Sequence, residues 1–410
     1  MHNEKDYLTR VEGHGTIDIK IKNGKIEKAE WQVIETPRFF EAMVVDKHFD
    51  DVSLIVSRIC GICSIAHATA SIRATERAFG LAVSKKTELF RRILMNAETI
   101  QSHILHLYFL ALPDFLGKES ISPIALRLKQ LANDICDVIG GRSTHPITMA
   151  AGGFTKFPSK ENLLILQKDL INSIPDLVET SKIFVDLKIP DFERETEFVS
   201  LKGVENYPWI GGQLMSSDGV LKNEDEYKKM TNEFMSDWST SKLAKLSRGS
   251  FAVGSLARFN NNFNLLHPKA KEVCEAFKLK PVCYNPFMNN ITQLIECFHV
   301  VYETLELFAK VLDMDLSPED IEVKPKKGKG VGVIEAPRGI LYHCNEYNKE
   351  GRIVRCDYVI PTGQNHANIR EDLNKLVKDY SKRGYSDNEI ELLCRMLVRS
   401  YDPCISCSVH

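Results

Sequence analysis

Long apolar runs and net charge are both scarce in this chain of 410 residues. Its most apolar later stretch, residues 104–113 (ILHLYFLALP), is about half as long as the roughly 20 residues that a membrane-spanning helix needs. Residues 1–30 lack the apolar segment of a secretory signal. Lysine plus arginine (53) nearly balances aspartate plus glutamate (55), which leaves no strong field for a polyanion or an anionic membrane surface. We therefore predict a cytoplasmic protein with no direct membrane insertion and no nucleic-acid partner.

The sequence also lacks internal repeats, low-complexity linkers and a dinucleotide-binding fingerprint. Eleven cysteines are present, and an odd number in a chain of intracellular character fits metal or redox chemistry better than a disulfide framework. Seven of them are scattered among apolar or mixed neighbours, and we interpret these as small core residues. These seven are Cys136, Cys274, Cys283, Cys297, Cys344, Cys356 and Cys394.

The periodicity of apolar residues predicts an α+β fold that is mostly α. Residues 16–34 alternate apolar and polar positions around Asn23 and Gly24, which predicts a hairpin within an N-terminal sheet at 8–36. Apolar residues at three- and four-residue spacing predict long core helices. We treat 1–410 as one domain with a helical core at 52–320, a β segment at 331–362 and C-terminal helices with a metal-binding tail at 367–410. The predicted helices are 52–80, 86–112, 119–139, 160–187, 267–279, 287–314, 367–383 and 387–400.

The other four cysteines form two C-x-x-C pairs near opposite ends of the chain. Cys60 and Cys63 lie in RICGICSIAH, and Cys404 and Cys407 lie in DPCISC. Four thiolates are a soft ligand set suited to nickel, iron, copper(I), zinc or an iron-sulfur cluster. A structural zinc site usually has its two pairs about 15–20 residues apart, whereas these pairs are separated by most of the chain. Structural zinc and a two-cysteine redox site stay open, but we favour a buried catalytic metal.

His67 stands four residues after Cys63, so on a helix that begins near Cys63 its ring lies over the face of that thiolate. It is then a candidate hydrogen-bond donor to the metal ligands. The alternative is a core histidine bonded to a backbone carbonyl.

In order along the chain, six motifs resemble the signature segments of nickel-iron hydrogenase large subunits. The resemblance extends from residue 10 to residue 410, and it is closest to the cytosolic multi-subunit type that includes sulfhydrogenases and NAD(P)-linked enzymes. It implies the large-subunit fold and reversible cleavage of dihydrogen. The motifs are RVEGH (10–14), PRFFEA (37–42), RICGICSIAH (58–67), EAPRG (335–339), IPT (360–362) and DPCISCSVH (402–410).

The resemblance implies a nickel-iron centre. By motif position, Cys60 and Cys404 are expected to be terminal nickel ligands. Cys63 and Cys407 are expected to bridge nickel to an iron that carries cyanide and carbon monoxide. Glu12 in RVEGH matches the carboxylate that accepts a proton from a terminal thiolate, which we take to be Cys404.

Further matches surround this centre. Arg338 in EAPRG resembles the arginine over the open metal site, where its permanently charged planar fork donates to an anionic ligand without giving up its proton. Pro361 and Thr362 match the lining of the cyanide pocket, and Asp402 matches the carboxylate that orients Arg338. The alternative for Arg338 is a core ion pair. One departure is Ser102, which stands where membrane-linked relatives carry an aspartate, so the resemblance does not extend to a close copy of their proton route.

A second metal site is implied at the last residue. Glu41 and His410 match the side-chain ligands of a magnesium or similar ion, with a backbone carbonyl near Tyr358 as a third ligand. Because imidazole is an unusual ligand for magnesium, Fe²⁺ is an alternative. His410 also resembles the mature end that a maturation protease leaves.

The implied partners follow from what the chain lacks. Without cluster motifs of its own beyond the two cysteine pairs, the chain needs an iron-sulfur small subunit to receive electrons, and the subgroup implies flavin and iron-sulfur diaphorase subunits. Nickel-insertion factors and the protease would act during assembly. Two other functions stay open: a metal-free homologue that serves as a structural or quinone-site subunit of a redox complex, and a scaffold held together by zinc.

Overall fold

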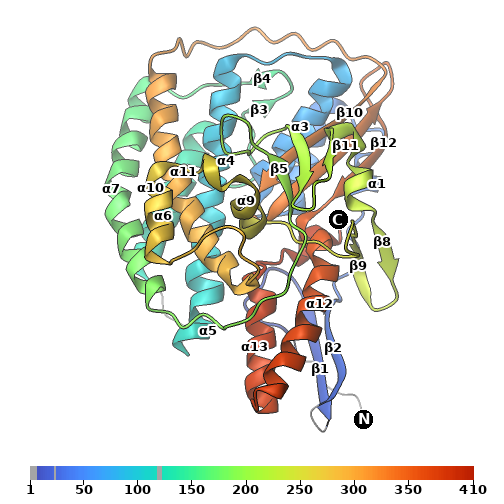
Figure 1. Ribbon diagram of the computed structural model, residues 1–410. Helices are drawn as coiled ribbons and strands as arrows, with labels where there is room; N and C mark the ends of the chain where they lie inside the picture. The colour runs from blue at the N-terminus through green and yellow to red at the C-terminus, as the bar shows by residue number, and fades with distance from the viewer. Residues whose placement is uncertain (1–6, 23–24, 118–121) are drawn as a thin grey trace.

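The computed structural model describes residues 7–22, 25–117 and 122–410 (Figure 1). Helices dominate it, so the predicted α+β, mostly α, class is confirmed. The helices are α1 (Phe40–Val44), α2 (Phe49–Val56), α3 (Ser64–Phe79), α4 (Lys85–Leu105), α5 (Leu112–Leu116), α6 (Pro123–Gly140), α7 (Lys160–Val185), α8 (Lys228–Thr231), α9 (Ser255–Asn262), α10 (Pro268–Ala276), α11 (Asn289–Leu312), α12 (Pro361–Lys382), α13 (Asp387–Ser400) and α14 (Ile405–Ser408).

The strands form small antiparallel sheets. They are β1 (Gly15–Lys22), β2 (Lys25–Val33), β3 (Met149–Ala150), β4 (Gly153–Phe154), β5 (Val199–Lys202), β6 (Gln213–Ser216), β7 (Leu221–Lys222), β8 (Phe234–Ser236), β9 (Ser239–Leu243), β10 (Gly328–Ala336), β11 (Gly339–Tyr347) and β12 (Ile353–Val359).

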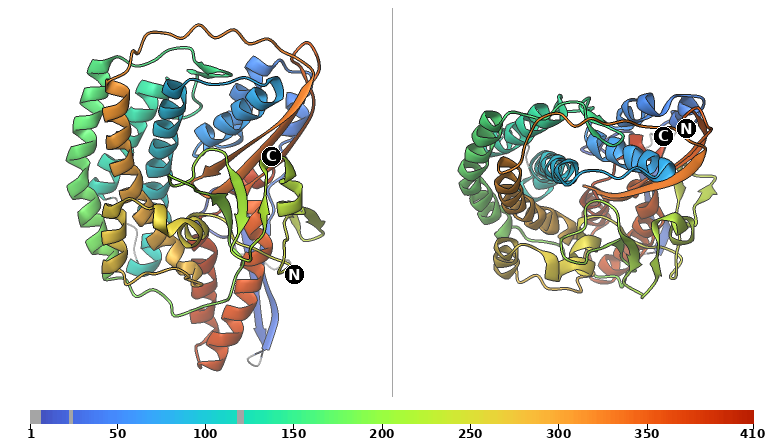
Figure 2. Two further views of the ribbon diagram at one scale, coloured as in Figure 1. Left: turned by 45° about the horizontal axis from the view of Figure 1, so that its top comes forward. Right: turned by 90° about the horizontal axis from the view of Figure 1, so that it is seen from above.

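The long helices α4, α6, α7 and α11 stand side by side as a bundle, and β10–β12 curve over α3 on the opposite side (Figures 1 and 2). Caps set several of the helix starts: Ser84 and Ser159 accept backbone hydrogen bonds at the starts of α4 and α7. Ser386 and Glu389 form a capping box at the start of α13. Among the described residues, no helix is both long and apolar enough to cross a membrane.

The predicted N-terminal hairpin is present as β1 and β2, which pair from Gly15↔Val33 to Lys22↔Lys25. Its turn, Asn23–Gly24, lies outside the described residues. This ribbon packs beside α12, so the first and last parts of the chain lie together (Figure 1).

Strand β10 seats helix α3 through alternating glycines. A Cβ at Gly328, Gly330 or Gly332 would lie 2.0–2.3 Å from a carbonyl oxygen of α3. The three oxygens belong to Ala78, Ala74 and Ala70, one helical turn apart. Only glycine permits this approach of helix to sheet. The strand on which α3 rests therefore begins at Gly328, before the start of the predicted β segment at 331–362.

Several predicted boundaries are wrong. The predicted helix at 52–80 is broken by a 3₁₀ turn at Ser57–Ile59 and by the loop that carries Cys60 and Cys63. The predicted helical core at 52–320 contains strands β3–β9, whose short lengths give weak periodic signals. Helix α12 begins at Pro361 rather than near 367, because proline is favoured in a first helical turn.

Candidate metal centre

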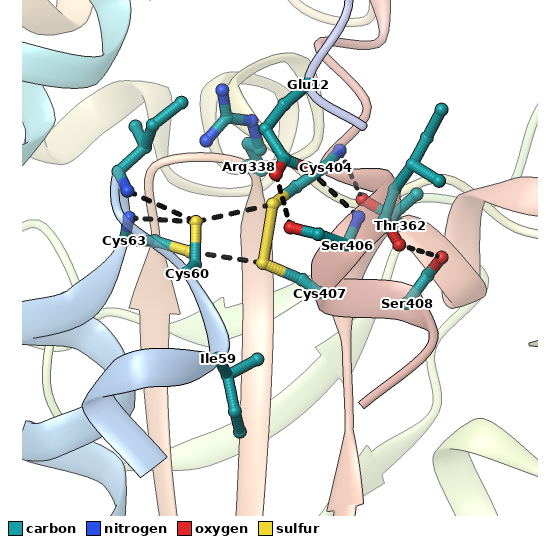
Figure 3. The surroundings of a disulfide bond; sticks show 12 residues. Glu12, Ile59, Cys60, Cys63, Arg338, Thr362, Cys404, Ser406, Cys407 and Ser408 are labelled. Carbon is teal, nitrogen blue, oxygen red and sulfur yellow. Dashed lines mark hydrogen bonds between the residues drawn. A yellow bond between two sulfur atoms is a disulfide. The ribbon is translucent and has the colours of Figure 1, made fainter. Parts of the chain in front are cut away.

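The four cysteines of the two C-x-x-C pairs meet in the interior. Their sulfur atoms all lie within 4.8 Å of one another, and all four residues are buried (Figure 3). The Sγ atoms of Cys60 and Cys404 are 3.4 Å apart, and those of Cys63 and Cys407 are 3.5 Å apart. The Cys60–Cys63 pair thus faces the Cys404–Cys407 pair. A single ion with four thiolate ligands requires this arrangement.

The structure joins Cys404 and Cys407 as a disulfide (Figure 3). Both sulfurs are ligands only as thiolates, so metal binding requires this pair to be reduced. On the other side, the backbone N–H groups of Ile62 and Cys63 donate to Cys60 Sγ at 3.2 and 3.3 Å. A hydrogen bond from the Cys63 side chain is the largest cause that lowers the pKa of Cys60 below its ordinary value, and the charge of Arg338 adds to it.

Two residues from other parts of the chain, the buried Glu98 and the half-buried Arg38, hold the cysteine segments. Helix α3 starts directly after Cys63 without a side-chain cap of its own. Instead, the Glu98 carboxylate of α4 accepts from the backbone N–H groups of Ile65 and Ala66 at 2.6 and 2.9 Å. Arg38, in the PRFFEA motif, donates to the carbonyl oxygens of Ile59 at 2.6 Å and of Ser406. It therefore ties the N-terminal cysteine loop to the C-terminal one.

Arg338 lies over the sulfur cluster on the two-residue turn between β10 and β11 (Figure 3). Its Nε donates to the carbonyl oxygen of Asp402 at 2.8 Å, and its Nη2 donates to the Asp402 carboxylate at 2.9 Å. Burial would raise the pKa of Asp402, but the charge and hydrogen bond of Arg338 and the charges of His106 and His103 together outweigh it, and the pKa lies below its ordinary value. The buried Nη1 of Arg338 has no hydrogen-bond partner in the part of the chain that the structure describes. A buried cationic N–H group without a partner, beside four thiols, is suited to donate a hydrogen bond to an anionic ligand of a metal held by those sulfurs.

Thr362 and Glu12 both touch the C-terminal cysteine segment. Thr362, on the first turn of α12 after Pro361, accepts from the backbone N–H of Cys404 at 2.9 Å. Glu12 pairs with Cys404 in a parallel β-bridge, and its carboxylate accepts from Ser406 N at 3.0 Å and from the Ser406 hydroxyl. The predicted neighbourhood of Glu12 and Cys404 is therefore present in the fold.

The ring of His67 is buried and pairs with His343 of β11, with Nδ1 and Nε2 3.0 Å apart. Burial is the main cause that lowers the pKa of His67 to about 3, and it lowers the pKa of His343 well below its usual range. Both rings are consequently neutral at pH 7. The predicted donation from His67 to a thiolate stays a prediction.

Glu41, Tyr358 and His410 also come together, as the resemblance implied. His410 Nε2 lies 3.0 Å from the Tyr358 carbonyl oxygen and 3.7 Å from Glu41 Oε1. The pKa of Glu41 is lowered, because the hydrogen bond and charge of His410 outweigh the effect of burial. The Nδ1 atom of His410 lies 3.0 Å from the carbonyl oxygen of Cys407. This second site is thus joined directly to the cysteine segment.

Ser102 of α4 is fully buried, and its hydroxyl has no partner among the described residues. Asp402 is instead approached by Gln293, whose Nε2 donates to Oδ2 at 3.1 Å.

Sequence reasoning did not single out Arg38, Glu98, Gln293 or His343. Arg38 lies in the PRFFEA motif and Glu98 lies in a long helix, and for both residues an ordinary ion pair is the simpler interpretation of the sequence. No local pattern separates their observed role from such a pair.

Comparison with known proteins bears on this geometry. The profile described as "Nickel-dependent hydrogenase" matches residues 38–122 and 221–410, and one described as "HoxL-like" matches residues 6–36. The chain is 34% identical to the alpha chain of sulfhydrogenase 1 of Pyrococcus furiosus over 99% of this chain and 97% of that protein. It is 32% identical to the alpha chain of sulfhydrogenase 2 of the same organism over 99% of this chain and 98% of that protein.

Solved structures agree on the fold. A NAD⁺-reducing NiFe hydrogenase in its H2-reduced state superimposes with a TM-score of 0.87 at 24% identity, covering 99% of this chain and 98% of that one. The Ni-Fe-Se hydrogenase of D. vulgaris Hildenborough gives 0.76 at 23% identity, covering 98% of each chain.

The resemblance inferred from six short motifs is therefore confirmed over nearly the whole chain, together with the predicted nickel-iron hydrogenase class and catalytic-subunit function. A family profile that covers most of the chain and a 34% identical relative of matching length lead to one conclusion: the chain belongs to the nickel-dependent hydrogenase family.

Proposed function

We propose that Cys60, Cys63, Cys404 and Cys407 hold a nickel-iron centre that splits dihydrogen into two protons and two electrons. The observation that supports this most directly is the buried cluster of four sulfurs within 4.8 Å of one another. Cys60 and Cys404 would hold the nickel, and Cys63 and Cys407 would hold both the nickel and an iron that carries cyanide and carbon monoxide. When bound, such a centre supplies a Lewis acid that polarises dihydrogen.

Arg338 has the role of orienting the ligands and substrate at this centre. Asp402 holds two of its nitrogen atoms, so the guanidinium plane has a fixed direction and Nη1 is left to donate elsewhere. An arginine keeps its proton under all physiological conditions, so it steers without competing for the proton that the reaction releases. Pro361 and Thr362 line the same region from the start of α12, and they are assigned to the pocket around the diatomic ligands.

Glu12 is assigned as the first carrier of the released proton. The proton passes from the Cys404 sulfur to the Glu12 carboxylate, which the β-bridge holds alongside that cysteine. Ser406 donates to both carboxylate oxygens and so fixes the direction of the group. The two electrons leave toward a separate electron-transfer partner.

Glu41, His410 and the Tyr358 carbonyl are proposed to bind a magnesium or similar ion that fastens the C-terminal segment over the cysteines. The distances of 3.0 and 3.7 Å support this, because two oxygens already converge on one imidazole nitrogen. Replacing Glu41 by Gln in the assembled enzyme should remove one equivalent of this ion and lower nickel retention. Unchanged contents of both metals would exclude the role.

The partners are proposed from the relatives, whose names identify them as single chains of multi-subunit hydrogenases. An iron-sulfur small subunit is the electron acceptor in this proposal. Diaphorase subunits with flavin and iron-sulfur clusters, a maturation protease, nickel-insertion factors and a cytoplasmic location stay predictions.

Metal analysis and infrared spectroscopy of the purified complex test the proposal. We expect nickel, iron in excess of nickel because the iron-sulfur subunits also carry iron, and stretching bands from cyanide and carbon monoxide. Zinc alone would favour the zinc-held scaffold, and the absence of metal from all four cysteines would favour the metal-free homologue. Either result refutes the assignment.

A further inference from the structure

The catalytic turn that carries Arg338 rests on a second arginine, Arg258, which no motif of the sequence pointed to. Arg258 lies in the first turn of α9 and is fully buried. Helix α9 starts at Gly254, whose φ of 115° lies in the region that favours glycine. A Cβ at Gly254 would come within 3.2 Å of the Arg338 carbonyl oxygen, so the start of α9 packs against the backbone of that residue.

All five N–H donors of Arg258 are used. Nε and Nη2 form a bidentate pair with Glu296 at 2.7 Å each, and Nη1 donates to Glu335 at 3.0 Å. The remaining donors reach the carbonyl oxygens of Ala336 and Pro337, both at 2.9 Å. These two carbonyls directly precede Arg338. A guanidinium is the one side chain with enough fixed donors to hold two carboxylates and two carbonyls together.

The turn itself has little else to define it. Ala336 pairs with Gly339 in the β10–β11 register, so Pro337 and Arg338 alone form the turn. Proline fixes its own φ, but its ψ, which sets the direction of the Pro337 carbonyl, is not fixed by the ring. The direction in which the Arg338 side chain leaves the sheet therefore depends on how the carbonyls of Ala336 and Pro337 are held.

We propose that Arg258 is a positioning residue: it clamps the Ala336–Pro337 carbonyls so that Nη1 of Arg338 faces the sulfur cluster. This deepens the proposed function and rests on it. Glu296 and Glu335 serve to hold Arg258 in register, and His103 and Tyr207 in turn hold Glu296 at 2.8 and 2.7 Å.

The test compares Arg258→Lys with Arg91→Lys in the purified hydrogenase complex. Lysine keeps the positive charge beside the carboxylates but cannot hold four acceptors in one plane. Arg91 is a matched control, because it is also buried, forms a bidentate pair with Glu76 at 2.9 and 2.6 Å and reaches the Ala150 carbonyl oxygen, yet does not touch the turn.

We expect Arg258→Lys to retain nickel and iron, to lose about tenfold in turnover and to shift the cyanide stretching bands in the same direction as Arg338→Lys. In an Arg338→Lys background, Arg258→Lys should add no further shift, because its whole effect passes through Arg338. Arg91→Lys should leave the bands in place. Additive shifts, or wild-type bands in Arg258→Lys, would overturn the proposal.

A second variant and a second readout keep the outcome clear. If Arg258→Lys does not fold, the double variant Arg258→Gln/Glu296→Gln removes opposite charges together, and the same band shifts are expected from it. Crystal structures of the metal-free chain should show the Arg338 guanidinium displaced from Asp402 in the Arg258 variant only. If the wild-type enzyme has no cyanide bands, the proposed centre is wrong. The displacement of Arg338 in the metal-free chain then decides the role of Arg258 by itself. An intact Arg338–Asp402 pair in the Arg258 variant would exclude the positioning role.

Discussion

On one side of the candidate centre, four sulfurs come from two short segments, each carrying its own C-x-x-C pair. On the other side, one guanidinium is held in place by residues that lie far apart in the sequence. Asp402 fixes the tip of Arg338, and Arg258 of α9 fixes the turn from which Arg338 departs. The sulfur side is specified locally, whereas the arginine side is specified by the fold.

Strand β10 links the two sides. Its first half carries the glycines that seat α3, the helix that follows Cys63, and its last residue, Ala336, leads into the turn of Arg338. A displacement of β10 would therefore disturb thiolates and guanidinium together. The comparison teaches that a few residues can specify the ligands of such a centre, while the position of the groups around those ligands depends on the whole fold.

Four experiments test this difference between the sulfur side and the arginine side.

The largest effect is expected on the sulfur side. Cys407→Ser should lose nearly all nickel and all measurable hydrogen oxidation, because a serine hydroxyl is a poor ligand for a soft metal. Cys297→Ser is the control, since Cys297 is also fully buried but lies on α11 outside the cluster. Nickel per chain and hydrogen oxidation are measured in both. Equal nickel loss in the two variants would mean that burial of cysteine, and not ligation, matters.

Removal of the proposed proton carrier should be the next largest effect. Glu12→Gln keeps the shape of the side chain but cannot take a proton, so nickel and infrared bands should persist while turnover falls about 100- to 10,000-fold. Glu35→Gln is a matched control, because Glu35 also accepts a backbone N–H nearby, from His14 at 3.0 Å, without touching the cysteine segment. Loss of nickel from Glu12→Gln would indicate that Glu12 has a structural role. Near-normal turnover would indicate that the proton leaves by another path.

The same contrast explains what the sequence could and could not predict. The cysteine pairs stood out because four thiolates form a soft ligand set. Glu12, Arg338 and the Glu41–His410 site were predicted because each lies in a short motif that resembles the family's signature segments. Arg258 was missed because it stands in an ordinary helical segment, SLARFNNN, and only the fold brings it to the turn.

Long helices were predicted well, since their apolar stripes repeat over many turns. The break at 57–63 was missed because the apolar spacing continues through the loop that carries Cys60 and Cys63. Strands β3–β9 are too short to show alternation. Gly328 and Gly330 were left out of the predicted β segment because their partner, the backbone of α3, is far away in sequence.

A stability effect should follow from disturbing the strand that links the two sides. In Gly330→Ala, the new Cβ would lie 2.0 Å from the Ala74 carbonyl oxygen, so α3 must move away from β10. We expect a loss of about 2–3 kcal/mol in the free energy of unfolding, as for other overpacked cores. Gly140→Ala is the control, because its Cβ would meet nothing closer than 3.4 Å. Urea unfolding of both variants measures the difference, and equal midpoints would contradict the close seating of α3.

The smallest effect expected is a pH dependence on the arginine side. Burial, aided by the charge of Glu296, raises the pKa of Glu335 from 4.5 to about 7 despite its bond to Arg258. The folded chain therefore holds a proton that the unfolded chain releases between pH 4.5 and 7, so stability falls as pH rises through this window. One pKa unit corresponds to about 1.4 kcal/mol, and because Glu335 and Glu296 titrate together we expect about 1–2 kcal/mol from this group.

Urea unfolding at pH 5 and pH 8 tests this prediction. Glu335→Gln should lose the decline in stability between the two pH values, because the amide does not titrate. Glu303→Gln is the control, because the pKa of Glu303 is shifted in the opposite direction: Arg92 lowers it against the effect of burial. The stability that Glu303 contributes is therefore present above pH 4.5 and lost only below it. The slope between pH 5 and 8 should therefore match the wild type in Glu303→Gln and flatten in Glu335→Gln. A wild-type slope in Glu335→Gln would mean that Glu335 is already ionised, with its charge fully balanced by Arg258.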